Sequence, residues 1–224
     1  VTNIVCVPPS GSAFLVGVSN VTCSFTDAGG QTVACSFTVT VTDNQAPTIT
    51  APPAVAVTTA PGLCVATGVT LGVPVTGDNC GVASVTSDAP AQFPVGATLV
   101  TWTVTDLSGN TAIDTQTVTV TDVELPQIVC PPDPVVVAAA GECHAVVSFT
   151  VTASDNCTVT NLVCEPASGS PFAVGLTPVN CTATDASGNS ASCRFQVTVQ
   201  DTTGPVVCAD PGRWSLAQGG TNDR

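Results

Sequence analysis

Apolar and polar residues alternate with a period of two along many short stretches of this chain. The clearest stretches are residues 35–42, 115–120 and 194–199, which are rich in valine and threonine. Such alternation is typical of β-strands with one buried face, and β-branched residues suit that pleated surface. Turn sequences of the form Asp-x-Ser-Gly-Asn stand between strands at 106–110 and 185–189. With no amphipathic helix of useful length, the pattern predicts an all-β protein.

The chain is built from repeats. Residues 46–122 and 125–201 align at an offset of 79, whereas 1–43 match only the second half of that unit, at an offset of 158. The tail at 204–208 matches only the opening of the unit, at 125–130. Head and tail thus read as two parts of one domain, and the predicted domains are 1–44, 45–123, 124–202 and 203–224. Units of this length with about seven short strands fit tandem immunoglobulin-like β-sandwiches, one of them split between the N-terminal segment and the C-terminal tail.

Composition indicates an extracellular protein. Sixteen acidic residues stand against three basic ones, and the formal net charge of −13 argues against nucleic acid and anionic membranes as partners. Twelve cysteines without a C-x-x-C motif, beside a single histidine, favour disulfides over zinc and therefore an oxidising compartment. We expect that a secretion signal has been removed from the chain. The apolar stretch 135–153 is interrupted by Glu142 and His144, so it predicts two strands and no membrane insertion.

Several short sequences resemble a known family. They are Pro-Gln-Ile-Val-Cys-Pro at 126–131, Ala-Ser-Asp-Asn at 153–156, Phe-Ala-Val-Gly at 172–175 and Cys-Thr-Ala-Thr-Asp-Ala-Ser-Gly-Asn at 181–189. Together they resemble the hyalin repeat, or HYR domain, over essentially the whole chain. The resemblance implies an immunoglobulin-like module of adhesion and structural proteins with no catalytic activity of its own. The middle repeat departs from the pattern, since Ala51, Val85, Trp102 and Asp114 stand where the next repeat has Cys130, Cys164, Cys181 and Cys193. We expect Trp102 to fill the core there.

The cysteines of the middle repeat suggest pairings. It keeps only Cys64 and Cys80, which predicts that these two pair and, by alignment, that Cys143 pairs with Cys157. The remaining four cysteines of the next repeat allow three connectivities. The HYR resemblance implies Cys130 with Cys193, which leaves Cys164 with Cys181. Carried to the head segment, the same scheme gives Cys6 with Cys23.

One cysteine of the head segment then lacks a partner. Cys35 matches Cys193, and the counterpart of Cys130 is Cys208 in the tail, two whole sandwiches away. We therefore expect a disulfide between Cys208 of one subunit and Cys35 of the next, with the tail completing the neighbour's sandwich by strand addition. A contact of this kind propagates into a head-to-tail homopolymer, such as an extracellular filament or matrix. The alternative is a stalk fragment of a longer adhesin or receptor array, with ligand binding elsewhere; Val1 and Arg224 fit a processed subunit and an arbitrary cut equally well.

Oxygen-bearing side chains gather where one repeat meets the next. At the first junction they are Asp43, Asn44, Asp78, Asn79, Asp106 and Asn110, and at the second junction Asp122, Glu124, Asp155, Asn156, Asp185 and Asn189. Converging oxygen ligands are how proteins bind calcium, so calcium at the junctions is one hypothesis, although no cofactor is required. The other is ordinary turn chemistry, in which each Asp bonds its own backbone.

Two further kinds of site were considered. Asn20, Asn156 and Asn180 begin N-x-Ser/Thr triplets and are candidates for N-glycosylation, which makes glycans possible partners. His144 has no neighbouring nucleophile with which to form a catalytic pair, and nothing in the composition indicates a cleft that would raise the pKa of a carboxyl group. We therefore expect no enzymatic activity.

Overall fold

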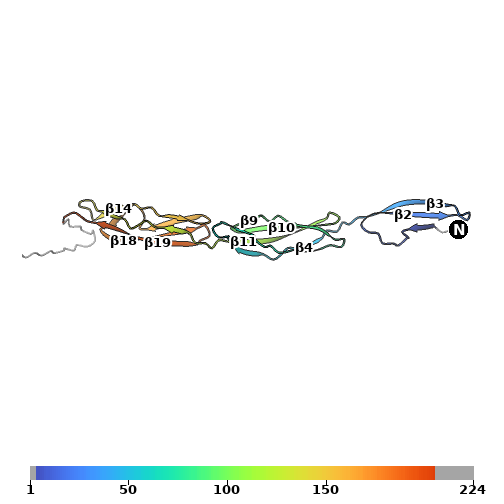
Figure 1. The fold of residues 1–224 in the computed structure, drawn as a ribbon, viewed down its shortest axis with the longest axis horizontal. Coiled ribbons are helices and arrows are strands. Elements are labelled where there is room, and N and C mark those ends of the chain that lie inside the picture. The colour runs from blue at the N-terminus through green and yellow to red at the C-terminus, as the bar shows by residue number, and fades with distance from the viewer. Residues whose placement is uncertain (1–3, 205–224) are drawn as a thin grey trace, which may run out of the picture. The chain divides into compact units, whose positions relative to one another are not determined.

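The computed structural model describes residues 4–204, and every regular element in them is a β-strand (Figure 1). The described residues divide into two compact units: residues 4–57 together with 67–120, and residues 58–66 together with 121–204. No helix able to cross a membrane occurs in this described range. The prediction of an all-β fold is confirmed.

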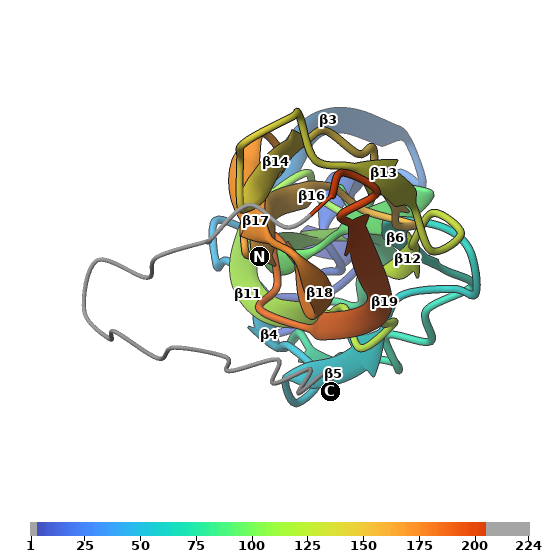
Figure 2. The ribbon, with the colours of Figure 1, turned by 90° about the vertical axis from the view of Figure 1, so that its left-hand side faces the viewer.

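The third repeat is a complete two-layer sandwich. Its strands are β12 (Gln127–Val129), β13 (Val135–Val137), β14 (His144–Val147), β15 (Thr152–Ser154), β16 (Val159–Glu165), β17 (Ser170–Ala173), β18 (Gly175–Asp185) and β19 (Ser190–Gln200). One sheet has the order β13-β19-β18-β16, with β18 and β19 side by side in Figure 2, while β12 pairs with β15 and β14 with β17. Phe172 from β17 and Val179, Phe195 and Val197 from the larger sheet share one buried cluster. Phe149 meets the ring of Phe195 edge-on, at 4.8 Å between centroids, and covers one side of this core.

The second repeat has the same strands but replaces covalent links by hydrogen bonds. Its strands are β4 (Thr48–Thr50), β5 (Val55–Thr58), β6 (Val65–Thr67), β7 (Val75–Gly77), β8 (Val82–Ser87), β9 (Gln92–Pro94), β10 (Gly96–Asp106) and β11 (Thr111–Thr121). Asp114 accepts a 2.7 Å hydrogen bond from the backbone N–H of Ala51, where the third repeat has the Cys130–Cys193 disulfide. Asp114 therefore makes by hydrogen bonding the connection that the next repeat makes covalently.

Trp102 is half-buried, so it does not fill the core as expected. Its indole N–H donates to the fully buried Gln116 at 3.1 Å, and the Gln116 amide donates to the carbonyls of Pro53 and Leu71, each at 2.8 Å. A polar side chain tolerates burial when its hydrogen-bonding groups are used in this way. Gln116, with Trp102 beside it, thus ties the larger sheet to the segments around residues 53 and 71.

The strand register corrects one alignment in this repeat. Ser87, and not Val85, lies opposite Trp102, while Val85 lies opposite Val104. In the third repeat the corresponding neighbours are Cys164 and Cys181. Equivalent residues of the second and third repeats are 79 positions apart over most of their length but 77 apart in strands β8 and β16. The third repeat has two residues fewer than the second before these strands and two more after them. A constant offset therefore placed Val85 at the position of Cys164 wrongly.

The first repeat is one layer of such a sandwich. Its strands β1 (Ile4–Val7), β2 (Gly17–Thr26) and β3 (Thr32–Val41) form a three-stranded antiparallel sheet that matches β16, β18 and β19. Within residues 4–44 no strand of a second layer is described, and we call this segment the half-sandwich. Phe37 is 54% exposed, whereas its counterpart Phe195 is 5% exposed. The face that forms a core in the third repeat is therefore only partly covered in the first, where Val21 is 3% exposed but Phe37 is not buried.

Candidate functional site at the repeat junctions

Three predicted disulfides are present in the structure. They are Cys6–Cys23, Cys130–Cys193 and Cys164–Cys181. The first and third of these each join two neighbouring strands at equivalent positions, which confirms that the half-sandwich follows the pattern of the third repeat. Cys143 is also disulfide-bonded.

The fourth described disulfide contradicts the sequence-based pairing. Cys64 is bonded to Cys157, 93 residues away, so the predicted pairs Cys64–Cys80 and Cys143–Cys157 are wrong. The physical reason is that Cys64 lies at the end of its repeat where the chain leaves it: Ala60 and Thr59 bond there to Val65 and Thr121. Cys80 lies at the opposite end, beside Asp43. Cysteines of one repeat thus face different neighbours.

Two cysteines of the described chain are free thiols, Cys35 and Cys80. Cys35 is exposed and borders an apolar hollow of about 360 Å³ lined by Ile4, Phe25 and Val33. Its predicted partner, Cys208, lies outside the described residues, so the intersubunit disulfide stays a prediction.

At the second junction a buried carboxylate binds the segments that meet there. Asp122 is 2% exposed, and one of its oxygens accepts hydrogen bonds from the Thr59 hydroxyl, the Glu124 N–H and the Asn156 amide at 3.2–3.3 Å. Glu124 in turn accepts the N–H of Gly62 at 2.8 Å. The loop that carries Cys64 is therefore held by hydrogen bonds as well as by its disulfide.

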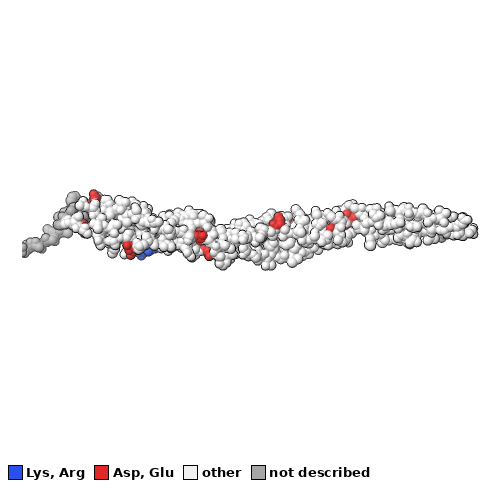
Figure 3. All heavy atoms as spheres, turned by 45° about the horizontal axis from the view of Figure 1, so that its top comes forward, with Lys and Arg blue, Asp and Glu red and all other residues white. Residues whose placement is uncertain are grey.

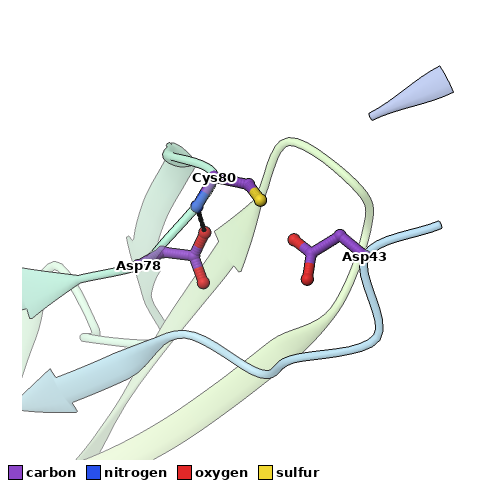
Figure 4. Close-up of side chains that lie close together, drawn as sticks. All are labelled: Asp43, Asp78 and Cys80. Carbon is purple, nitrogen blue, oxygen red and sulfur yellow. Dashed lines mark hydrogen bonds between the residues drawn. The ribbon is translucent and has the colours of Figure 1, made fainter. Parts of the chain in front are cut away.

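At the first junction the matching residues surround a thiol. Asp43 is 8% exposed and accepts the Gln45 N–H, while Asp78 accepts the Cys80 N–H at 2.7 Å. Figure 4 shows the Cys80 sulfur and the two carboxylates turned toward one another, and one ligand atom from each lies within 4.8 Å of the others. Burial, then a hydrogen bond to Asp43 and the charges of Asp43, Asp78 and Asp106, raise the pKa of the Cys80 thiol. At neutral pH this thiol therefore keeps its proton.

Both junctions contain buried oxygen atoms without a hydrogen-bond donor. These atoms are Asp43 Oδ2, Asp78 Oδ1, Asp122 Oδ2, Asp155 Oδ1 and Asn156 Oδ1. Burying an ionised carboxylate without a partner is costly, and a cation at the junction would supply the missing interaction. All five residues are among those that the sequence marked as oxygen ligands.

Other predicted ligands serve their own turns instead. Asp106 accepts the N–H groups of Ser108 and Asn110 and the Asn110 amide, each at 2.8 Å, and Asp185 does the same in the next repeat. Burial raises the pKa of both carboxyls, but these hydrogen bonds outweigh it and lower each pKa below its ordinary value. Asn110 and Asn189 also donate to the carbonyls of Asp43 and Asp122, respectively. The two aspartates therefore stabilise their turns, and the two asparagines also hold the junction segments by hydrogen bonds. Asn44 and Asn79 are exposed.

The three glycosylation candidates differ in accessibility. Asn20 on β2 and Asn180 on β18 are exposed. The Asn156 amide is partly buried and donates to Leu63 O and Asp122, which leaves it poorly placed to carry a glycan. Figure 3 shows scattered acidic side chains and very few basic ones, consistent with the composition.

Comparison with known proteins places these features in a family. The sequence model of the HYR domain matches residues 1–41, 42–121 and 121–199. Hyalin from Strongylocentrotus purpuratus is 36% identical over 215 residues, and hyalin from Lytechinus variegatus 34% identical over 214 residues. These matches cover 90% and 88% of the chain but 18% and 40% of the two relatives, so the chain spans less than half the length of either.

Solved cadherin structures give weaker matches. Drosophila N-cadherin EC1-4 superposes with a TM-score of 0.39 at 12% identity, covering 86% of this chain and 60% of that one. Protocadherin gammaB7 EC3-6 gives 0.36 at 17% identity, covering 83% and 58%. The family match and the four described disulfides indicate an extracellular, adhesion-type module. The chain belongs to the HYR domain family.

Proposed function

We propose that this chain is a structural subunit of an extracellular filament or matrix and polymerises head to tail. Residues 203–224 of one copy would complete the half-sandwich of the next. The observation that carries the proposal is the incompletely covered core face of the half-sandwich, where Phe37 is exposed at a position that is buried in the complete third repeat. An exposed apolar sheet face of this kind marks an interaction surface.

The tail is the occupant that fits this face. A groove of about 270 Å³ runs beside Phe37 and is lined by Pro8, Phe14, Val21 and Val39. The tail sequence Gly-Pro-Val-Val-Cys at 204–208 matches the opening of the third repeat, which includes β12 and Cys130. Cys130 bonds to Cys193, the counterpart of Cys35, so a docked tail would bring Cys208 to Cys35.

A denaturing gel with and without reductant tests the link. We expect a ladder without reductant that collapses to the 22.2 kDa subunit when disulfides are reduced. Cys35→Ser and Cys208→Ser should each abolish the ladder, whereas Cys80→Ser, which removes the other described free thiol, should leave it intact. A monomer on the gel without reductant, or a ladder that persists in Cys35→Ser, would refute the link.

The stalk of a longer array is the second candidate. It is favoured by the length of the hyalin relatives, of which this chain covers only 18% and 40%. In that case the half-sandwich would be completed within one continuous polypeptide. The gel separates the two candidates, because native material would then keep a high mass after reduction.

We further propose that the second junction binds calcium. Its cysteine is oxidised, so the buried unpaired atoms are oxygens only: Asp122 Oδ2, Asp155 Oδ1 and Asn156 Oδ1. Asp155 and Asn156 border a polar hollow of about 270 Å³ that Glu124 also lines, and calcium favours such oxygen sets. A bound ion would stabilise the folded state in proportion to its occupancy.

Thermal unfolding tests this site. We expect millimolar Ca²⁺ to raise the Tm by several degrees over the same sample in chelator, and Asp122→Asn to remove the increase. The matched control is Glu165→Gln, which removes one exposed charge away from the junction. An equal calcium effect in Asp122→Asn and the control would show that the ion binds elsewhere.

A further inference from the structure

The two junctions differ in the oxidation state of one sulfur. Cys80 and Cys157 each follow an Asp-Asn pair, and their sequence neighbours Asp78 and Asp155 both accept the cysteine N–H. Cys157 is bonded to Cys64, whereas Cys80 is a partly buried thiol. The position of the cysteine is therefore the same, but only the first junction offers sulfur as a ligand.

Loop geometry does not account for the carboxylates around this thiol. Asp43 uses one oxygen to hold the Gln45 N–H, and its other oxygen is buried without a partner. Asp78 likewise holds the N–H groups of Cys80 and Gly81 with one oxygen and leaves the other unpaired. The Asp43 side chain, more than nine-tenths buried, points toward Cys80 and Asp78 (Figure 4). The buried Oδ2 atom of Asp43 therefore has no donor among the described residues, and a cation would supply the interaction that it lacks.

We propose that Asp43, Asp78 and Cys80 form a binding site for a thiophilic divalent cation of the Zn²⁺ class. The inference deepens the proposed cation binding at the junctions by assigning them different ions. Zinc bonds thiolate sulfur at about 2.3 Å and carboxylate oxygen at about 2.0–2.2 Å in tetrahedral geometry, so ligand atoms around it lie about 3.5 Å apart. The three ligand atoms are already within 4.8 Å of one another, so small side-chain rotations suffice.

The chemistry of the ligand set favours zinc over calcium here. Calcium requires six to eight oxygen ligands, and sulfur does not serve it. The nearby Asn110 amide nitrogen already donates to the carbonyls of Asp43 and Gln45, which fixes that side chain in a supporting role. Zinc takes two carboxylates and one thiolate, with water as the fourth ligand. The Cys80 thiol releases its proton to solvent as the Zn–S bond forms, and no electron is transferred.

Metal binding to the intact chain tests the site. Equilibrium dialysis against Zn²⁺ in excess Ca²⁺ should give one tightly bound ion, and Cd²⁺ should produce a thiolate-to-metal absorption band. Cys80→Ser and Asp43→Asn should each weaken binding at least tenfold. Cys35→Ser, the matched control for loss of a free thiol, should bind as the parent does. Undiminished binding in Cys80→Ser, or loss of binding in Cys35→Ser, would overturn the proposal.

A second measurement does not depend on how the variants fold. Zn²⁺ should protect Cys80 of the unaltered chain from alkylation at least tenfold, as read by peptide mass spectrometry, while Cys35 of unassembled chains reacts equally with and without Zn²⁺. Equal alkylation of Cys80 with and without Zn²⁺ would also overturn the site. Neither result depends on the gel ladder or on the Asp122 calcium effect, so failure of this site and failure of the proposed function are distinguishable.

Discussion

Single residues at the turns set how this chain responds to acid. Asp106 and Asp185 have pKa values below the ordinary range, because turn hydrogen bonds outweigh the effect of burial. A group whose folded-state pKa is lowered contributes stability above its unfolded pKa and loses it as pH falls through the folded value. The two carboxylates therefore contribute fully at neutral pH.

We predict that stability is constant from about pH 7 to 5 and falls as pH drops below about 4, where unfolded aspartates take up protons. The double variant Asp106→Asn, Asp185→Asn should be less stable at neutral pH and should show a shallower acid slope. Urea unfolding midpoints measured across the pH range check both parts. A variant with the same slope as the parent would assign the acid sensitivity to other groups.

The residue scale also shows how much of the candidate site could be predicted from the sequence. Asp and Asn residues at the junctions were identified from their clustering, and five of them have buried unpaired oxygens. Which aspartates serve turns and which face the junction could not be predicted, because both carry the same side chain. The Gln116 bridge was missed as well, since a glutamine in an alternating strand reads as a surface residue until its partners at Pro53 and Leu71 are known.

At the scale of strands, β3 and β19 share a sequence pattern but not an environment. Both are long partners in the larger sheet, and Phe37 and Phe195 occupy matching positions. Phe195 packs against the second layer of its sandwich, whereas Phe37 has none within residues 4–44. The same side chain is therefore a core residue in one repeat and an interface residue in the other.

We predict opposite effects from the same substitution at these positions. Phe195→Ala should destabilise the third repeat by about 3–5 kcal/mol, the usual cost of deleting a buried aromatic ring. Phe37→Ala should change the stability of the unassembled chain by less than about 0.5 kcal/mol and should reduce polymer formation. Denaturant unfolding measures the first quantity and light scattering the second. Equal losses of stability would mean that Phe37 is already buried in the monomer.

At the scale of the molecule, the all-β fold was predictable and the covalent connection between repeats was not. The family matches lie within three residues of the predicted boundaries of the first three domains. The pairing of Cys64 with Cys157 escaped prediction, because an isolated repeat offers Cys64 and Cys80 as an apparent pair. Periodicity describes each sandwich alone, whereas the disulfide depends on which segments of successive repeats lie side by side, here those that carry Cys64 and Cys157.

We predict that the double variant Cys64→Ser, Cys157→Ser loses about 2–5 kcal/mol of stability, because the disulfide closes a loop of roughly 90 residues in the unfolded chain. Calorimetry of the unassembled chain should show the lower Tm in this variant and no change in Cys35→Ser, which removes a thiol without removing an intrachain crosslink. A Tm equal to that of the parent would contradict the bond.

The Cys64–Cys157 disulfide also changes how a pulling force on the chain is transmitted. A pull applied to the ends of the chain reaches Cys64 and crosses directly to Cys157, so the residues between them carry no load while the bond is intact, although the two cysteines are 93 positions apart. About 300 Å of extended chain is thereby withheld from stretching. Cleavage of a single peptide bond between Cys64 and Cys157 would leave the two ends of the molecule covalently connected through the disulfide. In an extracellular setting with proteases and mechanical stress, much of the second sandwich could be damaged before the material parts.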